Sequence, residues 1–236
     1  MAAKDRTTKI TVKLFQPMYE KFSRQLAAMP LLKDAFIEEM LLSELRYLEE
    51  DLSGIGNSEA ARRYIAGSLK RMGPKDRELE PVSIKVALST AAKLRRVAER
   101  HNLCRDAFVN FLFACLRGED RFLKYLGFST RVGKIGRQSG VEDMPTSPLK
   151  AIEVSLSDPL YYMRSECQDL YSCGLYALEL PPQMHGFSCY LPDHLVPGTV
   201  EHAEFQAAFD IDLDMAAARA RPEGDAKAKG HRGSTK

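Results

Sequence analysis

Lys9-Ile10-Thr11-Val12-Lys13-Leu14 and Ser83-Ile84-Lys85-Val86-Ala87-Leu88 are the two short stretches that decide the fold of this chain. Apolar residues recur at every second position in both, which is the period of a strand that buries one face and exposes the other. We expect the inner face to consist of Ile10, Val12, Leu14, Ile84, Val86 and Leu88. The outer face would then consist of Lys9, Thr11, Lys13, Ser83, Lys85 and Ala87.

Each stretch opens one copy of an internal repeat. Residues 29–37, MPLLKDAFI, match residues 101–109, HNLCRDAFV, which lie 72 positions later. Between strand and motif, apolar side chains at helical spacing predict a first helix, entered through Pro17 in one copy and capped by Ser89 in the other. A longer second helix follows, with Asp34 or Asp106 in its first turn. Each copy therefore has the order strand, helix, helix.

One short strand with two helices cannot pair its own edges, so the two copies need each other. We expect the two strands to pair antiparallel over the four helices. Between the copies, the chain breaks at Gly54 and Gly56, and Ser58 then caps a bridging helix over residues 58–72. A helix of this kind carries the chain back to an antiparallel partner strand, and its arginines could add contacts to phosphates.

The duplicated pattern resembles the ribbon-helix-helix superfamily of DNA-binding proteins, to which the Arc and MetJ repressors belong, with both halves in one polypeptide. The resemblance covers a module of residues 6–128, with copies at 6–51 and 80–126. It rests on pattern and duplication, and residues 29–32 lack the Gly-x-Ser-type turn that often precedes the second helix in that family.

The resemblance implies that the two-stranded ribbon enters the major groove of double-stranded DNA and contacts base edges with its outward side chains. These are the outer-face residues named above, and because Ala87 replaces the lysine at position 13, the ribbon would suit a non-palindromic half-site. Lys33 and Arg105 would approach phosphates beside the start of each second helix, and Arg6 would follow the DNA backbone. The alternative is that these residues are only the solvent face of a strand.

Charge is strongly segregated although the whole chain has a net charge of +2. Residues 61–140 carry a net charge of +11 and residues 141–215 a net charge of −11. Residues 129–149 read as a linker, and residues 150–215 as a small acidic α+β domain for self-association or a protein partner. Residues 216–236 are expected to be a disordered basic tail. The expected fold class is mostly α with a short two-stranded antiparallel ribbon in a pseudo-dimeric ribbon-helix-helix arrangement, plus this C-terminal domain.

Catalytic, metal and membrane functions have little support in the sequence. No nucleotide-binding glycine motif, nucleophile elbow or HExxH string occurs, so we expect neither an enzyme nor a cofactor. A zinc site built from Cys167, Cys173, His185, Cys189 and His194 would lack the usual two-residue ligand spacing. No apolar run has the roughly 20 residues of a membrane helix, so we expect a cytoplasmic protein that is nucleoid-associated when bound to DNA.

Three functions fit these patterns. The first is a sequence-specific transcriptional regulator, most simply a repressor. The second keeps the DNA-binding module but makes the protein an accessory of plasmid transfer, since tandem members of the family also occur in conjugation complexes. The third is an antitoxin-like interaction module, in which the acidic C-terminal region binds another protein and the basic half only balances its charge.

Overall fold

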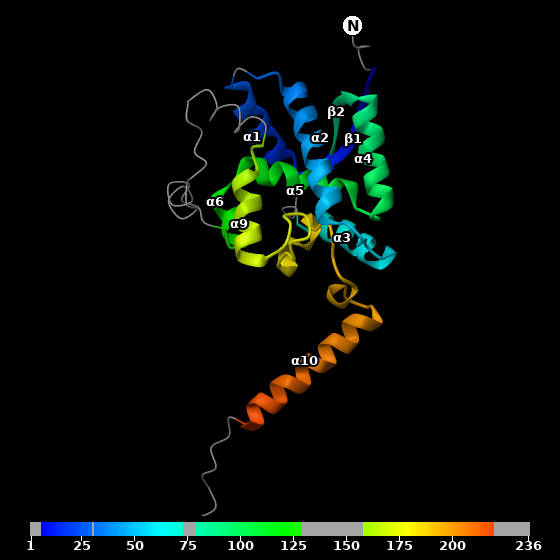
Figure 1. Ribbon diagram of the computed structural model, residues 1–236, viewed down its shortest axis with the longest axis vertical. Coiled ribbons are helices and arrows are strands. Elements are labelled where there is room, and N and C mark those ends of the chain that lie inside the picture. The colour runs from blue at the N-terminus through cyan, green and yellow to red at the C-terminus, as the bar shows by residue number, and fades with distance from the viewer. Residues whose placement is uncertain (1–5, 30, 73–78, 129–157, 220–236) are drawn as a thin grey trace, which may run out of the picture. The chain divides into compact units, whose positions relative to one another are not determined.

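The computed structural model describes residues 6–29, 31–72, 79–128 and 158–219, with side chains described as far as residue 210. This part of the chain is mostly helical and contains one two-stranded antiparallel sheet (Figure 1), so the coarse fold class expected from the sequence is confirmed. The repeat region consists of β1 (Thr7–Leu14), α1 (Gln16–Ala27), α2 (Lys33–Asp51), α3 (Glu59–Arg71), β2 (Glu80–Ala87), α4 (Leu88–Arg100), α5 (Arg105–Arg117) and α6 (Asp120–Tyr125). The C-terminal region consists of α9 (Tyr161–Tyr171), η1 (Pro182–Phe187), η2 (Asp193–Leu195) and α10 (Val200–Arg219).

β1 and β2 pair antiparallel, as the alternation predicts. Ile10 lies opposite Ile84, the residue in the same position of the second copy. The inner side chains of the ribbon are almost fully buried, and they include Ile10, Val12, Leu14, Ile84 and Val86. The outer lysines and hydroxyl residues are exposed, so the strand faces were assigned correctly up to residue 86.

The end of β2 differs from the prediction. The strand passes directly into α4, which begins at Leu88 with Ala87 as its N-cap. Leu88 is therefore a helical residue with 53% of its surface exposed, not the last inner residue of the strand. The prediction that Ser89 is the N-cap is also wrong, because Ser89 already lies inside the first turn. Ser58 does cap α3 as predicted, accepting the N–H of Ala61 at 3.0 Å.

The helices of the two copies interlock beneath the ribbon. α2 contacts β2 and α4 of the second copy, and α5 contacts β1 and α1 of the first. Nine consecutive residues of α5, from Ala107 to Cys115, are buried, because this helix is covered on nearly all sides. The core of the repeat region therefore belongs to both copies jointly.

The structure divides the chain differently from the expected domain boundaries. One compact unit extends to Asp193, and a second begins at His194, so residues 158–193 belong with the repeat region. η1 packs on α3 and α5, and a Cβ atom at Gly186 would lie 2.6 Å from the backbone of Leu69, so only glycine allows this close approach. The described part of 150–215 contains no strand. The expected linker 129–149 and residues 220–236 of the expected tail lie outside the described residues, whereas residues 216–219, which were expected to be disordered, form the end of α10.

Candidate functional site

The exposed face of the ribbon brings together the outward residues that the sequence singled out. Lys9 lies directly opposite Lys85, and Thr11 lies opposite Ser83. Lys13, opposite Pro81, continues the face toward the end of β1. All of these except Pro81 were expected here, and each of their side chains is exposed. Ala87, opposite Thr7, closes the face at its other end and is half-buried.

The opposed lysines are the notable feature of this face. Like charges directly across an antiparallel pair destabilise a ribbon. Among the described residues, no carboxylate lies within 4.0 Å of Lys9, Lys13 or Lys85 to offset that repulsion. These lysines are thus without a carboxylate partner in the described part of the chain, and the nearby hydroxyls of Thr11 and Ser83 can both donate and accept hydrogen bonds.

Two polar residues hold the ribbon onto the helices, and neither was singled out from the sequence. Asn110 is fully buried and Glu38 is half-buried. Asn110 of α5 accepts the N–H of Phe15 at 3.1 Å and donates to the carbonyl of Lys13 at 2.8 Å. Glu38 of α2 accepts the N–H of Ala87 at 2.6 Å and the hydroxyl of Thr90. The same position of the repeat thus fixes the strand-to-helix junction of the opposite copy. The 72-residue offset could have shown this equivalence, although the partners could not be known.

The two second helices present their first turns differently. Neither α2 nor α5 has a side-chain N-cap hydrogen bond. Lys33 on α2 is exposed and points to Tyr19, whose hydroxyl lies 3.3 Å from its Nζ. Arg105 on α5 reaches the ribbon instead, where its Nη2 donates to the carbonyl of Thr11 at 2.6 Å. Arg105 therefore lies at the edge of β1, whereas Lys33 lies against α1.

Arg6 precedes the ribbon, and its side chain is exposed. Its carbonyl accepts the N–H of Leu88 at 2.8 Å, which extends the strand pairing to the start of α4. The backbone of Arg6 is thereby fixed beside the ribbon while the guanidinium stays at the surface.

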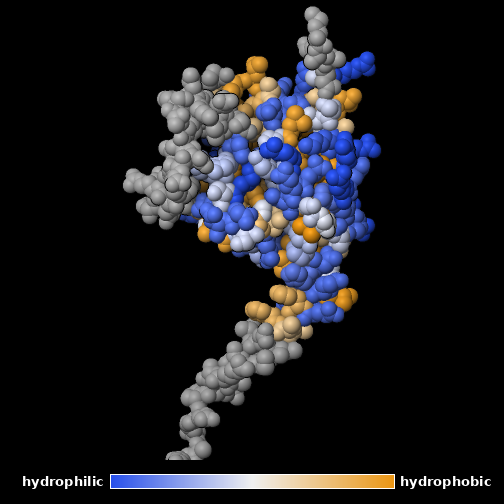
Figure 2. Space-filling view, viewed as in Figure 1, coloured by the Kyte–Doolittle hydropathy of each residue, from blue (hydrophilic) through white to orange (hydrophobic). Residues whose placement is uncertain are grey.

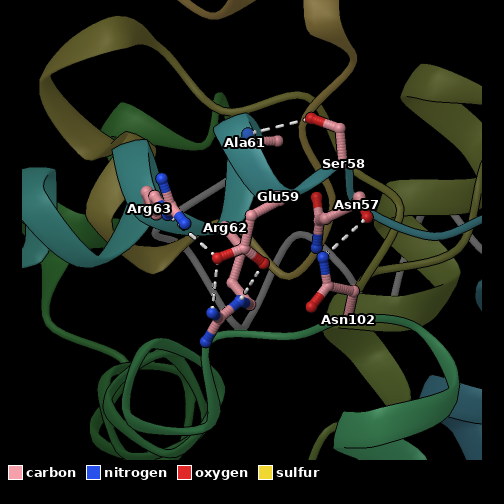
Figure 3. Close-up of polar contacts among 7 residues, drawn as sticks. All are labelled: Asn57, Ser58, Glu59, Ala61, Arg62, Arg63 and Asn102. Carbon is pink, nitrogen blue, oxygen red and sulfur yellow. Dashed lines mark hydrogen bonds and ion pairs between the residues drawn. The ribbon is translucent and has the colours of Figure 1, made fainter.

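The start of α3 lies beside the turn between α4 and α5 (Figure 3). The amide of Asn102 donates to the carbonyl of Asn57 at 3.0 Å. Arg62 and Arg63 both donate to the carboxylate of Glu59, at distances from 2.7 to 3.0 Å. The hydrogen bonds from Arg62 lower the pKa of Glu59 to about 2. Glu59 thus offsets one of the four positive charges of this helix, which keeps a net charge of about +3.

A surface hollow lies beside the ribbon, between β1, α4 and the α4–α5 turn. Four of its lining side chains are cationic, namely Lys9, Arg62, Arg95 and Arg105, and two are carboxylates, Glu99 and Asp106. The face over α4 is predominantly hydrophilic (Figure 2). Each of the three arginines is paired with a carboxylate, Arg62 with Glu59, Arg95 with Glu99 and Arg105 with Asp106, so this side has only a modest excess of positive charge.

The part of the chain that the structure describes contains no group of side chains arranged for metal binding and no helix suited to a membrane. There, no three His, Cys, Asp or Glu side chains gather in a way that could hold a metal ion. None of the described helices is both long and apolar enough to traverse a bilayer. The five cysteines are free thiols, and burial raises the pKa of Cys115 and Cys189 far above the ordinary value.

No protein-family model, no curated protein and no solved structure matches this chain.

Proposed function

We propose that this protein binds double-stranded DNA sequence-specifically and that the β1–β2 ribbon lies in the major groove. The observation that carries the proposal is the exposed ribbon face, where Lys9 and Lys85 lie opposite each other and have no carboxylate partner among the described residues. A two-stranded ribbon fits the major groove, and lysine donates to the O6 and N7 acceptors of guanine. Thr11 and Ser83 add groups that hydrogen bond to any base edge.

The arrangement of the repeat supports a tandem ribbon-helix-helix module. The central pair joins Ile10 to its own counterpart, Ile84, which is the register that an approximate two-fold relation between the copies requires. Glu38 and Asn110, also counterparts, each hold the strand-to-helix junction of the opposite copy. An intertwined core of this kind would normally need two chains, and here both halves belong to one.

Phosphate contacts would come from the sides of the ribbon. Arg105 is held at the edge of β1, and the uncapped first turn of α2 presents backbone N–H groups next to Lys33. Helix N-termini favour anions because their N–H groups are unpaired and the helix dipole is positive there. The ribbon face is asymmetric, since Lys13 has Ala87 as its counterpart, which would suit a site without two-fold symmetry.

The proposal covers two biological roles, transcriptional repression and DNA binding in plasmid transfer. Expression of the protein beside a reporter driven by its own promoter separates them, because only a repressor lowers reporter output. The third expectation, an antitoxin-like module, needs a free C-terminal partner surface. Residues 158–193 pack on the repeat region of the same chain, so they favour the DNA-binding proposal over that alternative.

The full chain tests the proposal by fluorescence anisotropy. The two probes are a duplex from upstream of the protein's own gene and a scrambled duplex of equal composition, each titrated across salt. Tighter binding to the native duplex, with log affinity falling linearly with log salt, supports the proposal, and the slope counts the phosphates contacted. Equal affinity for both duplexes, or no binding to either, contradicts it.

A further inference from the structure

A pocket lies on the part of the repeat module formed by α1, α5, α6 and η1, and we call it the α1–α6 pocket. Its volume is about 490 Å³, which falls within the range of small-molecule sites, roughly 300–1,000 Å³. No residue of the ribbon face lines it. The pocket is therefore a separate feature of the surface from the ribbon face.

The walls of the α1–α6 pocket are mainly apolar. The apolar lining side chains include Pro17, Met18, Phe122, Met184 and Phe187. The rings of Phe122 and Phe187 meet edge to face with centroids 6.0 Å apart, which fixes one wall. Walls of this composition accommodate an aromatic or alkyl body.

Cations outnumber carboxylates in the same lining. Lys21, Arg117 and Arg121 line the pocket together with one carboxylate, that of Glu119. Glu119 is shared between Arg117 and Lys21, whose Nζ lies 4.0 Å from it. Arg121 donates to the hydroxyl of Tyr125 at 3.4 Å. The lining thus contains one carboxylate and three cationic side chains, so the pocket has an excess of positive charge.

Arg117 provides an independent observation. Only 10% of its side chain is exposed, and its Nε is buried without a hydrogen-bond partner among the described residues. A buried donor of this kind is costly unless a partner arrives. The counterpart of Arg117 in the first copy is Leu45, which is fully buried in the core. In the second copy, an arginine therefore occupies a position that is apolar in the first copy.

We propose that the α1–α6 pocket binds a small organic anion, a carboxylate that carries an apolar aromatic or alkyl body. The body lies against Met18, Phe122 and Phe187, and the carboxylate accepts from the guanidinium of Arg117. Hydrogen bonds between arginine and a carboxylate are charge-assisted and frequently bidentate, so the arginine selects anions over neutral analogues of the same shape.

The position of the pocket suggests what such a ligand would influence. Phe15 lines the pocket and also donates its N–H to Asn110, which holds the end of β1. A ligand that shifts Phe15 would change the junction between ribbon and core. This consequence for DNA affinity rests on the proposed function, whereas binding to the pocket does not.

Isothermal titration calorimetry on the full chain tests the pocket without DNA. The probes are 4-phenylbutyrate, the neutral 4-phenylbutan-1-ol and the cationic 4-phenylbutylamine, which share one apolar body. We expect one molecule of 4-phenylbutyrate per chain, with the alcohol and the amine bound about tenfold more weakly or worse. Equal binding of acid and alcohol, or no saturable binding of the acid, would overturn the proposal.

Two substitutions locate the binding. Arg117→Met keeps an unbranched stem but removes the guanidinium and should weaken 4-phenylbutyrate about tenfold, while Arg24→Met, at an exposed position of α1, should have no effect. Met18→Trp, which fills the apolar wall, should weaken the acid and the alcohol alike. Equal losses from Arg117→Met and Arg24→Met would contradict the assignment. If Arg117→Met proves unfolded by circular dichroism, Met18→Trp and the three-ligand comparison still decide.

Discussion

Adjacent residues of β1 face opposite sides of the ribbon, as Thr11 and Val12 show. Val12 is fully buried beneath the ribbon, whereas Thr11 is exposed on its outer face. The two residues lie in the same strand, so a charged residue at either position has a similar backbone conformation. Any difference between the two substitutions therefore reports on the faces of the ribbon.

We expect Val12→Asp to lower the free energy of unfolding by at least about 3 kcal/mol, because it buries an unpaired charge. Thr11→Asp should leave the protein folded and abolish DNA binding, since a carboxylate would face the bases and phosphates beside Lys9 and Lys85. Urea denaturation monitored by circular dichroism measures the first effect, and fluorescence anisotropy measures the second. Val12→Asp with unchanged stability would show that the ribbon's inner face is misassigned.

At the scale of elements, α2 and α9 are joined through a buried carboxylate. Glu44 of α2 has no exposed surface, and its Oε2 accepts from the hydroxyl of Tyr176 at 2.6 Å and from Arg164 of α9 at 2.7 Å. The guanidinium of Arg164 also lies over the ring of Tyr47, 3.7 Å from its centroid. Burial raises the pKa of Glu44 above its ordinary value of 4.5, although Arg164 and Tyr176 act in the opposite direction.

This raised pKa predicts a pH dependence. A carboxyl group with a higher pKa in the folded state binds its proton more tightly on folding, so its stabilisation is complete below pH 4.5 and is lost as pH rises through the raised value. We expect the stability of the wild type, relative to Glu44→Gln, to fall from acidic to neutral pH. The charge of Asp51, whose own pKa burial also raises, adds to the raised pKa of Glu44.

Urea unfolding of both proteins across pH measures this difference. Glu50→Gln, at an exposed position of the same helix, is the matched control and should track the wild type. A constant difference between the wild type and Glu44→Gln across pH would contradict the account of Glu44.

The elements of the repeat could be predicted well from the sequence, and their junctions less so. Alternation at Ile10, Val12, Ile84 and Val86 predicted the ribbon because period-two burial is a local property. Leu88 continued the alternation in the sequence but lies in α4, since periodicity alone does not show where a strand turns into a helix. The roles of Glu44 and Arg164 could not be predicted, because the two residues lie 120 positions apart.

At the scale of the whole molecule, residues 158–193 complete the core of the repeat region. Tyr176 packs against Phe108 and Phe111, with ring centroids 5.5 and 6.0 Å apart. The apolar residues that are buried in this stretch are Leu160, Cys167, Leu175, Tyr176, Leu178, Leu180, Met184, Phe187, Cys189 and Leu191. Net acidity and short apolar runs suggested that this stretch belongs to a separate domain. That prediction was wrong because composition does not show which surface a segment covers.

Two truncations test this division. A chain that ends at residue 193 should keep the melting temperature of the full chain, because the second compact unit begins after it. A chain that ends at residue 128 should lose more than about 3 kcal/mol of unfolding free energy, since each buried Leu or Phe side chain contributes ~1.5–3 kcal/mol. Equal stability of the two truncated proteins in urea would show that residues 158–193 are not part of the core.

The most direct measurement of the central claim compares the wild-type full chain with a Lys9→Ala, Lys85→Ala double variant on native and scrambled duplexes across salt. Lys124→Ala, on the exposed surface of α6, is the control for removing one lysine outside the ribbon. We predict that the wild type and Lys124→Ala prefer the native duplex. The double variant should bind both duplexes equally, because its base contacts are lost. Its salt slope should be nearly unchanged, because the phosphate contacts remain. A double variant that keeps the full preference for the native duplex would contradict the claim that the ribbon recognises sequence.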